Sequence, residues 1–221
     1  MITGKTAFIF GASGLIGNLL LKELINDPAY SKVVVIVRRP LVIVNPKVQE
    51  ILLNEFESFD FEEISISDVQ VFCCLGTTIK TAGSKEEFKK VDYELPMKIA
   101  AWAKSKGIPV LAAISSIGAN ADSGNFYLRT KGEMEDGLKS FQFSKLILVR
   151  PSLLLGTRRE FRLGEELAKV FSGVMNLIFF GPLKKYRAIK ASKVARAMKV
   201  LANSEAGEIV YESDKLEELG A

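Results

Sequence analysis

The sequence predicts an α/β fold: a doubly wound parallel sheet with helices on both faces, followed by a small, less regular C-terminal segment. Apolar, β-branched runs alternate with helical patterns through residues 5–150. Residues 32–37 read Lys-Val-Val-Val-Ile-Val, as expected for a strand buried on both faces. A glycine-rich stretch at residues 11–17 separates the first strand from the first helix. Because parallel strands need right-handed crossovers that cover the sheet, this alternation indicates a doubly wound sheet.

The changes of periodicity set the expected elements. Pro28 ends the first helix near residue 26, because proline cannot continue a helix. Pro96 should bend or divide a long helix with one apolar face. The expected strands are residues 5–10, 32–37, 48–53, 69–75, 110–115, 145–149 and 208–211, and the helices after the first are residues 85–106, 127–138, 160–180 and 191–203. The pattern becomes irregular after Pro151, which divides a single domain (1–221) into a core (1–151) and a further segment (152–221).

The composition indicates a globular chain. Of the 221 residues, 48% are hydrophobic and 25% are charged, which excludes a disordered chain. The net charge of +4 is too small to indicate a nucleic-acid partner. The chain has no histidine, which excludes histidine-based catalytic triads and histidine metal ligands, and no metal is expected.

Three features bear on the compartment. The first residues run straight into an apolar strand without a charged start or a cleavage site, so no targeting segment is expected. Cys73 and Cys74 are adjacent, and neighbours in a strand point to opposite faces, so they should stay unpaired. The most apolar stretch, residues 167–183, is interrupted by Lys169 and by glycines, which disfavours a membrane span. We therefore expect a cytoplasmic protein.

The stretch Gly11-Ala-Ser-Gly-Leu-Ile-Gly17 lies where a dinucleotide-binding fold holds a pyrophosphate. Glycine lets the chain turn sharply, lets the backbone approach the phosphates and lets the helix pack closely on the strand. The N-terminus of the following helix offers free N–H groups and a partial positive charge. No Gly-Lys-Ser/Thr follows, which excludes a nucleoside-triphosphate loop. The alternative is a tight turn that holds no ligand.

The end of the second strand bears on which dinucleotide is bound. An acidic residue there would bind the ribose 2′-hydroxyl of NAD, but this strand ends in Arg38 and Arg39. Two cations would attract a 2′-phosphate, so the sequence favours NADP(H). The same residues disfavour a methyltransferase, which usually needs a carboxylate here to hold ribose hydroxyls. The alternative is a solvated basic pair.

The sequence contains three Tyr-x-x-x-Lys pairs, and the motif alone does not select among them. On a helix this spacing places both side chains on one face. Only Tyr127 and Lys131 open a predicted helix that follows a strand ending in serines, Ser115 and Ser116. Ligands of parallel sheets lie at the C-terminal ends of strands, so this pair is the candidate acid/base site. The other pairs are Tyr186 with Lys190 and Tyr211 with Lys215.

In this order, the glycine stretch, the serines and the Tyr127/Lys131 pair resemble the short-chain dehydrogenase/reductase superfamily, whose members have a Rossmann-like fold. Four further segments resemble its atypical, Tat-interacting-protein-like NAD(P)-binding branch. They are Cys73-Cys-Leu-Gly-Thr-Thr78, Lys80-Thr-Ala-Gly83, Val91-Asp92 and Ser115-Ser-Ile-Gly-Ala119. The resemblance covers most of the chain and is strongest up to residue 155.

The resemblance implies an NADP(H)-dependent oxidoreductase. Tyr127 would be the general acid/base, Lys131 would activate it, and Ser116 would bind the substrate carbonyl. The cofactor would be held by Gly11, Ala12, Ser13, Gly14, Leu15 and Ile16 at the pyrophosphate, by Arg38 and Arg39 at the 2′-phosphate, by Leu75, Gly76 and Thr77 at the ribose, by Ser115 and Lys131, and by the backbone of residues 151–154, including Pro151 and Leu153, at the nicotinamide. Two positions depart from the family pattern: Asn54 stands in place of an aspartate beside the adenine, and Asp92 in place of an asparagine of a proton relay.

Two other functions stay open from the sequence. One is an NADP(H)-binding regulatory or interaction protein with little or no turnover, and the other is an epimerase or dehydratase that recycles tightly bound cofactor. The complete set of Ser116, Tyr127 and Lys131 favours the oxidoreductase, and the roughly 70 residues after Pro151 are few for an epimerase's substrate domain. We expect a small-molecule substrate, no nucleic acid or membrane as partner, and a monomer or homodimer.

Overall fold

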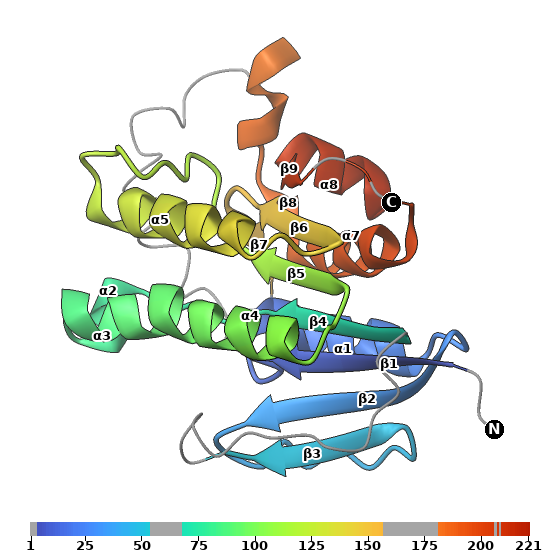
Figure 1. Ribbon diagram of the computed structural model, residues 1–221. Helices are drawn as coiled ribbons and strands as arrows, with labels where there is room; N and C mark the ends of the chain where they lie inside the picture. Colours follow the sequence, from blue (N-terminus) through green and yellow to red (C-terminus); the bar gives the residue numbers. More distant parts are fainter. Residues whose placement is uncertain (1–3, 54–67, 157–180, 206, 208) are drawn as a thin grey trace.

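The computed structural model describes residues 4–53, 68–156, 181–205, 207 and 209–221. Within them, seven parallel strands form one sheet in the order β3-β2-β1-β4-β5-β6-β9, and β7 pairs with β8 in a second, two-stranded sheet (Figure 1). The winding reverses between β1 and β4, as in a dinucleotide-binding fold. This confirms the predicted doubly wound parallel sheet.

The described elements have the following bounds. The strands are β1 (Lys5–Phe10), β2 (Tyr30–Val37), β3 (Val48–Leu52), β4 (Val69–Cys73), β5 (Val110–Ile114), β6 (Lys145–Arg150), β7 (Leu154–Leu155), β8 (Ile189–Lys190) and β9 (Val210–Glu212). The helices are α1 (Leu15–Ile25), α2 (Ile79–Ala82), α3 (Lys85–Lys89), α4 (Leu95–Ser105), α5 (Phe126–Ser140), α7 (Ala191–Asn203) and α8 (Ser213–Leu219), with a π-helical turn η3 (Lys90–Glu94) and a 3₁₀ turn η5 (Gly181–Tyr186).

The core has two layers, one on each face of the sheet. The first layer packs α1 and α7 against the sheet, and the second packs α4 and α5 against the opposite face (Figure 1). Successive strand residues point to opposite faces, so Cys73 joins the second layer while Phe72 and Cys74 join the first. The two cysteines are buried and unpaired, as their adjacency predicts.

Residues 85–106 are divided, but the division precedes Pro96. The structure separates α3 from α4 by η3, in which the Leu95 N–H bonds to the Lys90 carbonyl five residues earlier and widens the turn. Pro96 lies in the first turn of α4, where its missing N–H loses no helical hydrogen bond. Asp92 lies at the centre of η3 and is fully buried.

Other boundaries also differ from the predicted ones. β2 begins at Tyr30 rather than at residue 32, and β9 covers Val210–Glu212 rather than residues 208–211. Helices α2 and α8 were not predicted, because four and seven residues are too few to show an amphipathic period. The helix expected at residues 160–180 lies outside the described residues, as does most of the apolar stretch 167–183. Among the helices that the structure describes, none has the length and apolarity to cross a bilayer.

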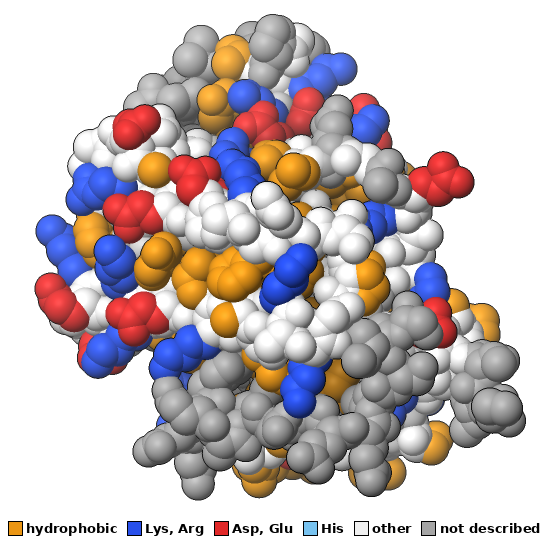
Figure 2. Space-filling model, in the orientation of Figure 1, with side chains coloured by type: hydrophobic (Ala, Val, Ile, Leu, Met, Phe, Trp, Pro, Cys, Tyr) orange, Lys and Arg blue, Asp and Glu red, His pale blue; other side chains and the backbone are white. Residues whose placement is uncertain are grey.

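Charges of both signs are interspersed on the face of the molecule drawn in Figure 2. The described residues include ion pairs on the helices: Lys89 lies 3.2 Å from Glu133, and Lys139 lies 3.0 Å from Asp136.

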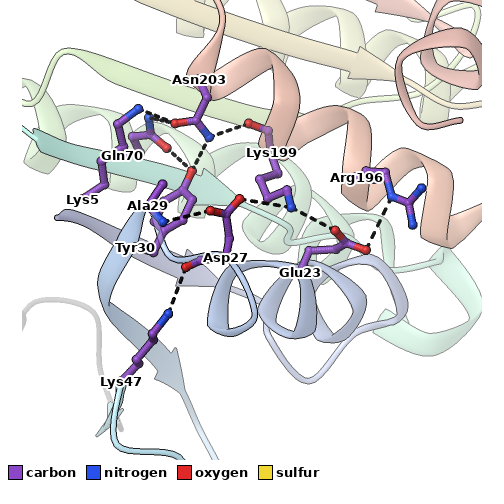
Figure 3. A network of polar contacts seen from close by, with 10 residues as sticks. All are labelled: Lys5, Glu23, Asp27, Ala29, Tyr30, Lys47, Gln70, Arg196, Lys199 and Asn203. Atoms are coloured by element: carbon purple, nitrogen blue, oxygen red, sulfur yellow. Dashed lines mark hydrogen bonds and ion pairs between the residues drawn. The ribbon is translucent and has the colours of Figure 1, made fainter.

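A polar network closes the amino-terminal end of the sheet (Figure 3). The hydroxyl of Tyr30, which is fully buried, donates to Gln70 Oε1 at 2.6 Å and accepts from Asn203 Nδ2 at 2.7 Å. Gln70 Nε2 donates to the Ala202 carbonyl at 3.0 Å. These bonds connect β2 and β4 to the end of α7. Burial raises the pKa of Tyr30 to about 12.

Replacing Tyr30 by phenylalanine leaves Gln70 Oε1 and Asn203 Nδ2 without this hydroxyl. We expect Tyr30→Phe to lower the free energy of unfolding by about 1–3 kcal/mol at about pH 8. The difference in unfolding free energy between wild type and variant should shrink above about pH 10. Tyrosine ionises there in the unfolded chain, whereas folded Tyr30 keeps its proton to about pH 12. The wild type therefore loses stability in this pH range, and the variant, which lacks the hydroxyl, does not. Denaturant unfolding at about pH 8 and about pH 11 measures both effects.

The matched control is Tyr186→Phe, a change at a half-buried tyrosine outside this network. It should cost less free energy of unfolding than Tyr30→Phe at about pH 8, because it removes no hydroxyl from this network. An equal loss for Tyr30→Phe at both pH values would contradict the role given to the buried hydroxyl.

Candidate active site

Five loops at the carboxyl edge of the sheet form the candidate site. They follow β1, β2, β4, β5 and β6, and their residues line two adjacent cavities that share Leu75. We call these the Arg38 cavity and the Tyr127 cavity, after one lining residue of each. Ligands of doubly wound sheets bind at this edge, where the strand order reverses.

The loop after β1 requires glycine at two positions. Gly11 has a φ of +88°, and a Cβ added to it would lie 2.6 Å from the Cys74 carbonyl oxygen. A Cβ on Gly17 would lie 2.2 Å from the Gly11 carbonyl oxygen. These close approaches hold the start of α1 against the ends of β1 and β4. The first turn of α1 therefore lies at the Tyr127 cavity, where a helix N-terminus favours an anion.

The Arg38 cavity lies between the ends of β1 and β2 and the turn η3. It has an empty volume of about 900 Å³ and combines an apolar floor with one cation, Arg38. Its lining residues are Phe10, Gly11, Ser13, Ile36, Val37, Arg38, Leu53, Leu75, Val91 and Leu95. An apolar slot with a cation at its rim suits the base and phosphate of an adenosine phosphate.

The Tyr127 cavity contains the three predicted catalytic residues, Ser116, Tyr127 and Lys131. It has an empty volume of about 570 Å³ and lies at the ends of β4, β5 and β6. Its lining residues are Gly14, Leu15, Ile16, Cys74, Leu75, Gly76, Thr77, Asp92, Ile114, Ser115, Ser116, Tyr127, Lys131, Pro151 and Leu154. The fold thus brings together residues that lie far apart in the chain: Gly14 and Lys131, for example, are 117 positions apart.

Helix α5 presents Tyr127 and Lys131 from its first turns. The Asn125 side chain caps the helix by accepting the Leu128 N–H at 3.1 Å. Tyr127 is buried, and its ring packs against Phe88 with ring centroids 5.6 Å apart. The four-residue spacing places Lys131 one turn later on the same face, as predicted.

Lys131 is paired with a carboxylate that is itself fully buried. Its Nζ lies 2.7 Å from Asp92 Oδ1, and it donates to the Ile114 carbonyl at 3.4 Å. Burial opposes the charged form of Lys131, but the charges of Asp92 and of ionised Tyr127 outweigh it, so the pKa of Lys131 lies above its usual value. Lys131 is therefore an ammonium at neutral pH.

The donors and acceptors of this cavity fit the polar parts of a dinucleotide. The Lys131 ammonium donates one hydrogen bond, to the Ile114 carbonyl, and forms an ion pair with Asp92, and with three hydrogens it can also donate to a ligand. Ser115 Oγ is buried, lines the cavity and has no hydrogen-bond partner among the described residues. A buried hydroxyl without a partner is unfavourable, which favours a polar ligand group at this place.

A second charged pair anchors α5 to the sheet. Arg150, at the end of β6, donates from Nε and Nη2 to the two carboxylate oxygens of Glu135, at 2.8 and 2.5 Å. This hydrogen bonding raises the pKa of Arg150. Glu135 is buried and follows Lys131 by one helical turn. Bidentate pairs fix direction as well as distance, so this contact sets the height of α5 beside the cavity.

Most of the residues predicted from the sequence line one of the two cavities, but three do not. Ala12 is fully buried in the core, Arg39 is exposed outside the Arg38 cavity, and Leu153 packs on the cluster of Phe88 and Tyr127. Neither cavity is lined by the other two Tyr-x-x-x-Lys pairs, and Asn54 lies outside the described residues. The roles given to individual residues stay predictions.

The ion pair between Asp92 and Lys131 was not predicted. One signal was available, because Asp92 interrupts the apolar face of the expected helix between Phe88 and Leu95. Cys74 also lines the Tyr127 cavity. Burial raises the pKa of Cys73 to about 11 and that of Cys74 well above its usual value, so neither thiol is a nucleophile at neutral pH.

Relatives with curated names extend over most of the chain. Protein HTATIP2 of Rattus norvegicus is 40% identical over 174 residues, which cover 76% of this chain and 71% of that protein. "Protein FMP52, mitochondrial" of Candida albicans is 35% identical over 196 residues, covering 86% of each chain. A comparison with protein-family models finds none that matches.

The expectation of a cytoplasmic protein is contradicted by these relatives. The FMP52 proteins of Candida albicans, Scheffersomyces stipitis and Debaryomyces hansenii all have names that place them in mitochondria. The expectation partly depended on unpaired cysteines. Cys73 and Cys74 are buried with raised pKa values, so their reduced state does not report the compartment.

Solved structures give the same fold. MoeE5, solved in complex with UDP-glucose and NAD, superposes with a TM-score of 0.67 at 17% identity, covering 97% of this chain and 80% of that one. The thiolation-reductase di-domain of an archaeal non-ribosomal peptide synthetase gives a TM-score of 0.67 at 12% identity, covering 94% and 70%. With the sequence relatives, these likenesses establish that the chain belongs to the atypical short-chain dehydrogenase/reductase family that includes HTATIP2 and FMP52.

Proposed function

We propose that the chain is an NADP(H)-dependent oxidoreductase that transfers a hydride to or from a small carbonyl or alcohol substrate, with Tyr127 as general acid/base. The meeting of Ser116, Tyr127 and Lys131 in one cavity, beside a second cavity with a cation, carries this proposal. Structures of similar fold were solved as complexes with NAD, which supports a nicotinamide dinucleotide as cofactor.

A bound nicotinamide would supply or accept the hydride. The Ser116 hydroxyl would hold the substrate oxygen, and Tyr127 would give a proton to that oxygen during reduction or take it during oxidation. Free tyrosine has a pKa of about 10, which is high for this task. The adjacent Lys131 ammonium favours the phenolate, and the position of Tyr127 in the first turn of α5 acts in the same direction.

The preference for NADP(H) depends on Arg38 more than on Arg39. Arg38 lines the cavity that suits the adenosine end, together with Gly11 and Ser13 of the glycine loop. Arg39 is exposed and does not line it. A charge-assisted contact between a guanidinium and a 2′-phosphate is stronger than an ordinary hydrogen bond.

We expect the purified protein to bind NADPH at least about tenfold more tightly than NADH, because one charge-assisted contact contributes about 1.5–3 kcal/mol. Arg38→Ala should remove most of this preference while leaving NADH affinity nearly unchanged. Arg39→Ala is the matched control and should have the smaller effect. Calorimetric titration of the three proteins with both dinucleotides measures this, and a preference that survives in Arg38→Ala would contradict the assignment.

We expect Tyr127→Phe to bind NADPH like the wild type and to lose turnover by at least about a hundredfold, since general acid–base catalysis contributes about 10²–10⁴-fold. The assay follows NADPH oxidation against a panel of aldehydes and ketones. Tyr186→Phe changes a tyrosine of the same motif outside both cavities, so it should keep full activity. Unchanged turnover in Tyr127→Phe would exclude the proposed acid/base role.

The same panel addresses the regulatory alternative. A protein that binds NADPH tightly yet oxidises it with no carbonyl compound would be a dinucleotide-binding regulator. The complete catalytic set favours the enzyme, because a sensor of the dinucleotide needs no substrate hydroxyl and no proton donor.

A further inference from the structure

The carboxylate of Asp92 makes two contacts that join separate parts of the Tyr127 cavity. Asp92 Oδ1 lies 2.7 Å from Lys131 Nζ of α5, and Asp92 Oδ2 accepts the N–H of Thr77, in the loop after β4, at 2.9 Å. The exposed fractions of the Asp92 and Lys131 side chains are 0% and 3%. One oxygen of the carboxylate thus pairs with the ammonium of α5, and the other accepts the N–H of the loop after β4.

We propose that Asp92 is a positioning residue for the acid/base step: its carboxylate holds the Lys131 ammonium against the loop after β4 and compensates its charge beside Tyr127. This inference rests on the proposed function. Asp92 contacts Lys131 and Thr77, and it acts on the reaction through Lys131. The π-helical turn η3 supports the assignment, because such turns are rare and occur frequently at functional sites.

An asparagine could not make both contacts. A carboxylate accepts hydrogen bonds at both oxygens, whereas an amide accepts at one and donates at the other. If the amide oxygen faced Lys131, its NH₂ group would face the Thr77 N–H, which is also a donor. With the opposite orientation, the NH₂ group of the asparagine would face the Lys131 ammonium, and both groups are donors. The aspartate at this position therefore has a definite chemical consequence.

The charged and titratable groups around Lys131 come from three elements. Asp92 lies on η3, Tyr127 on α5 and Cys73 on β4, and each acts on the Lys131 ammonium. With Asp92 ionised and Tyr127 protonated, the Asp92–Lys131–Tyr127 group carries no net charge. Removing the carboxylate leaves a buried net positive charge, so the first proton of the Tyr127–Lys131 pair should leave at lower pH.

The first test is the unfolding free energy of wild type and Asp92→Asn at pH values from about 7 to about 10. In the wild type the pKa of Lys131 lies above 10.5, so the stability from the pair is present at pH 7 and is lost only as pH rises past this value. In Asp92→Asn the charge of Asp92 no longer opposes burial, so we expect the folded variant to release the Lys131 proton before the unfolded chain does and to gain stability as pH rises. We expect Asp92→Asn to be less stable than the wild type at about pH 7, and the difference between their free energies of unfolding to become smaller towards about pH 10.

Two further variants isolate the ion pair. Asp136→Asn removes the carboxylate of an exposed ion pair with Lys139 on the same helix. The free energy of unfolding of this variant should differ little from that of the wild type at every pH. In a Lys131→Met background, Asp92→Asn should stabilise the protein, because Asp92 there has lost its cation. If Asp92→Asn alone does not fold, folding of the double variant supports the pairing. Failure of both, or a gap that does not change with pH, would overturn the proposal.

The second test is the pH dependence of turnover with a carbonyl substrate from the panel. The proposal expects the break in the pH–rate profile of Asp92→Asn to move to lower pH by about one unit or more. A profile that keeps its break while the rate falls would assign Asp92 a merely structural role and overturn the proposal. The absence of any NADP(H)-dependent turnover in the wild type would instead refute the proposed function, and the unfolding data need no cofactor or substrate.

Discussion

The reversal of winding between β1 and β4 is the constraint on which the rest of the site depends. Chain segments leave β1 towards β2 and β3 on one side, and the later strands add on the other side of β1 beyond β4. The loops after β1 and β4 therefore diverge at their carboxyl ends and leave room for a ligand. Where β1 and β4 end, before these loops diverge, the two backbones lie close together, and the lack of a side chain on Gly11 permits its approach to the Cys74 carbonyl.

Charged pairs, and not only apolar contacts, attach helix α5 to the turn η3 and to the sheet. Along its buried face, Lys131 meets Asp92 and Glu135 meets Arg150. Buried ion pairs add little net stability compared with apolar residues of the same shape, but removing one partner is strongly unfavourable. Their effect is to fix position. They set the depth of α5 beside β5 and β6, and thereby the place of Tyr127 relative to Ser116.

The sequence was sufficient to predict the parallel sheet, the glycine loop and the clustering of Ser116, Tyr127 and Lys131, because each has a local signature. Strand and helix periods differ, and the carboxyl edge of a parallel sheet collects the loop residues without further information. Residues 85–106 show the limit. Pro96 was the visible breaking signal, but the structure places the widened turn before it, at Lys90–Glu94. The Asp92–Lys131 pair that this turn carries is a contact across 39 positions of the chain, which no local pattern encodes.

Arg38 and Arg39 show a second limit. Their types favour a phosphate, but which of two adjacent cations faces a cavity depends on where β2 ends and how the following residues turn. The compartment was predicted wrongly for a different reason. Unpaired cysteines inform on redox conditions only when they are accessible, and both thiols are buried here.

The central claim is hydride transfer in the Tyr127 cavity, and isotope transfer tests it most directly. NADPH carrying deuterium at the transferable position of its nicotinamide is incubated with the protein and a panel of carbonyl compounds, and the alcohols are analysed by mass spectrometry. The nicotinamide C4 of NADPH carries two hydrogens, one on each face of the ring, and either can be replaced by deuterium. We expect deuterium on the carbinol carbon of at least one alcohol product, and from only one of these two labelled forms of NADPH. Tight NADPH binding with no labelled alcohol from any compound would contradict it and leave a dinucleotide-binding protein without this chemistry.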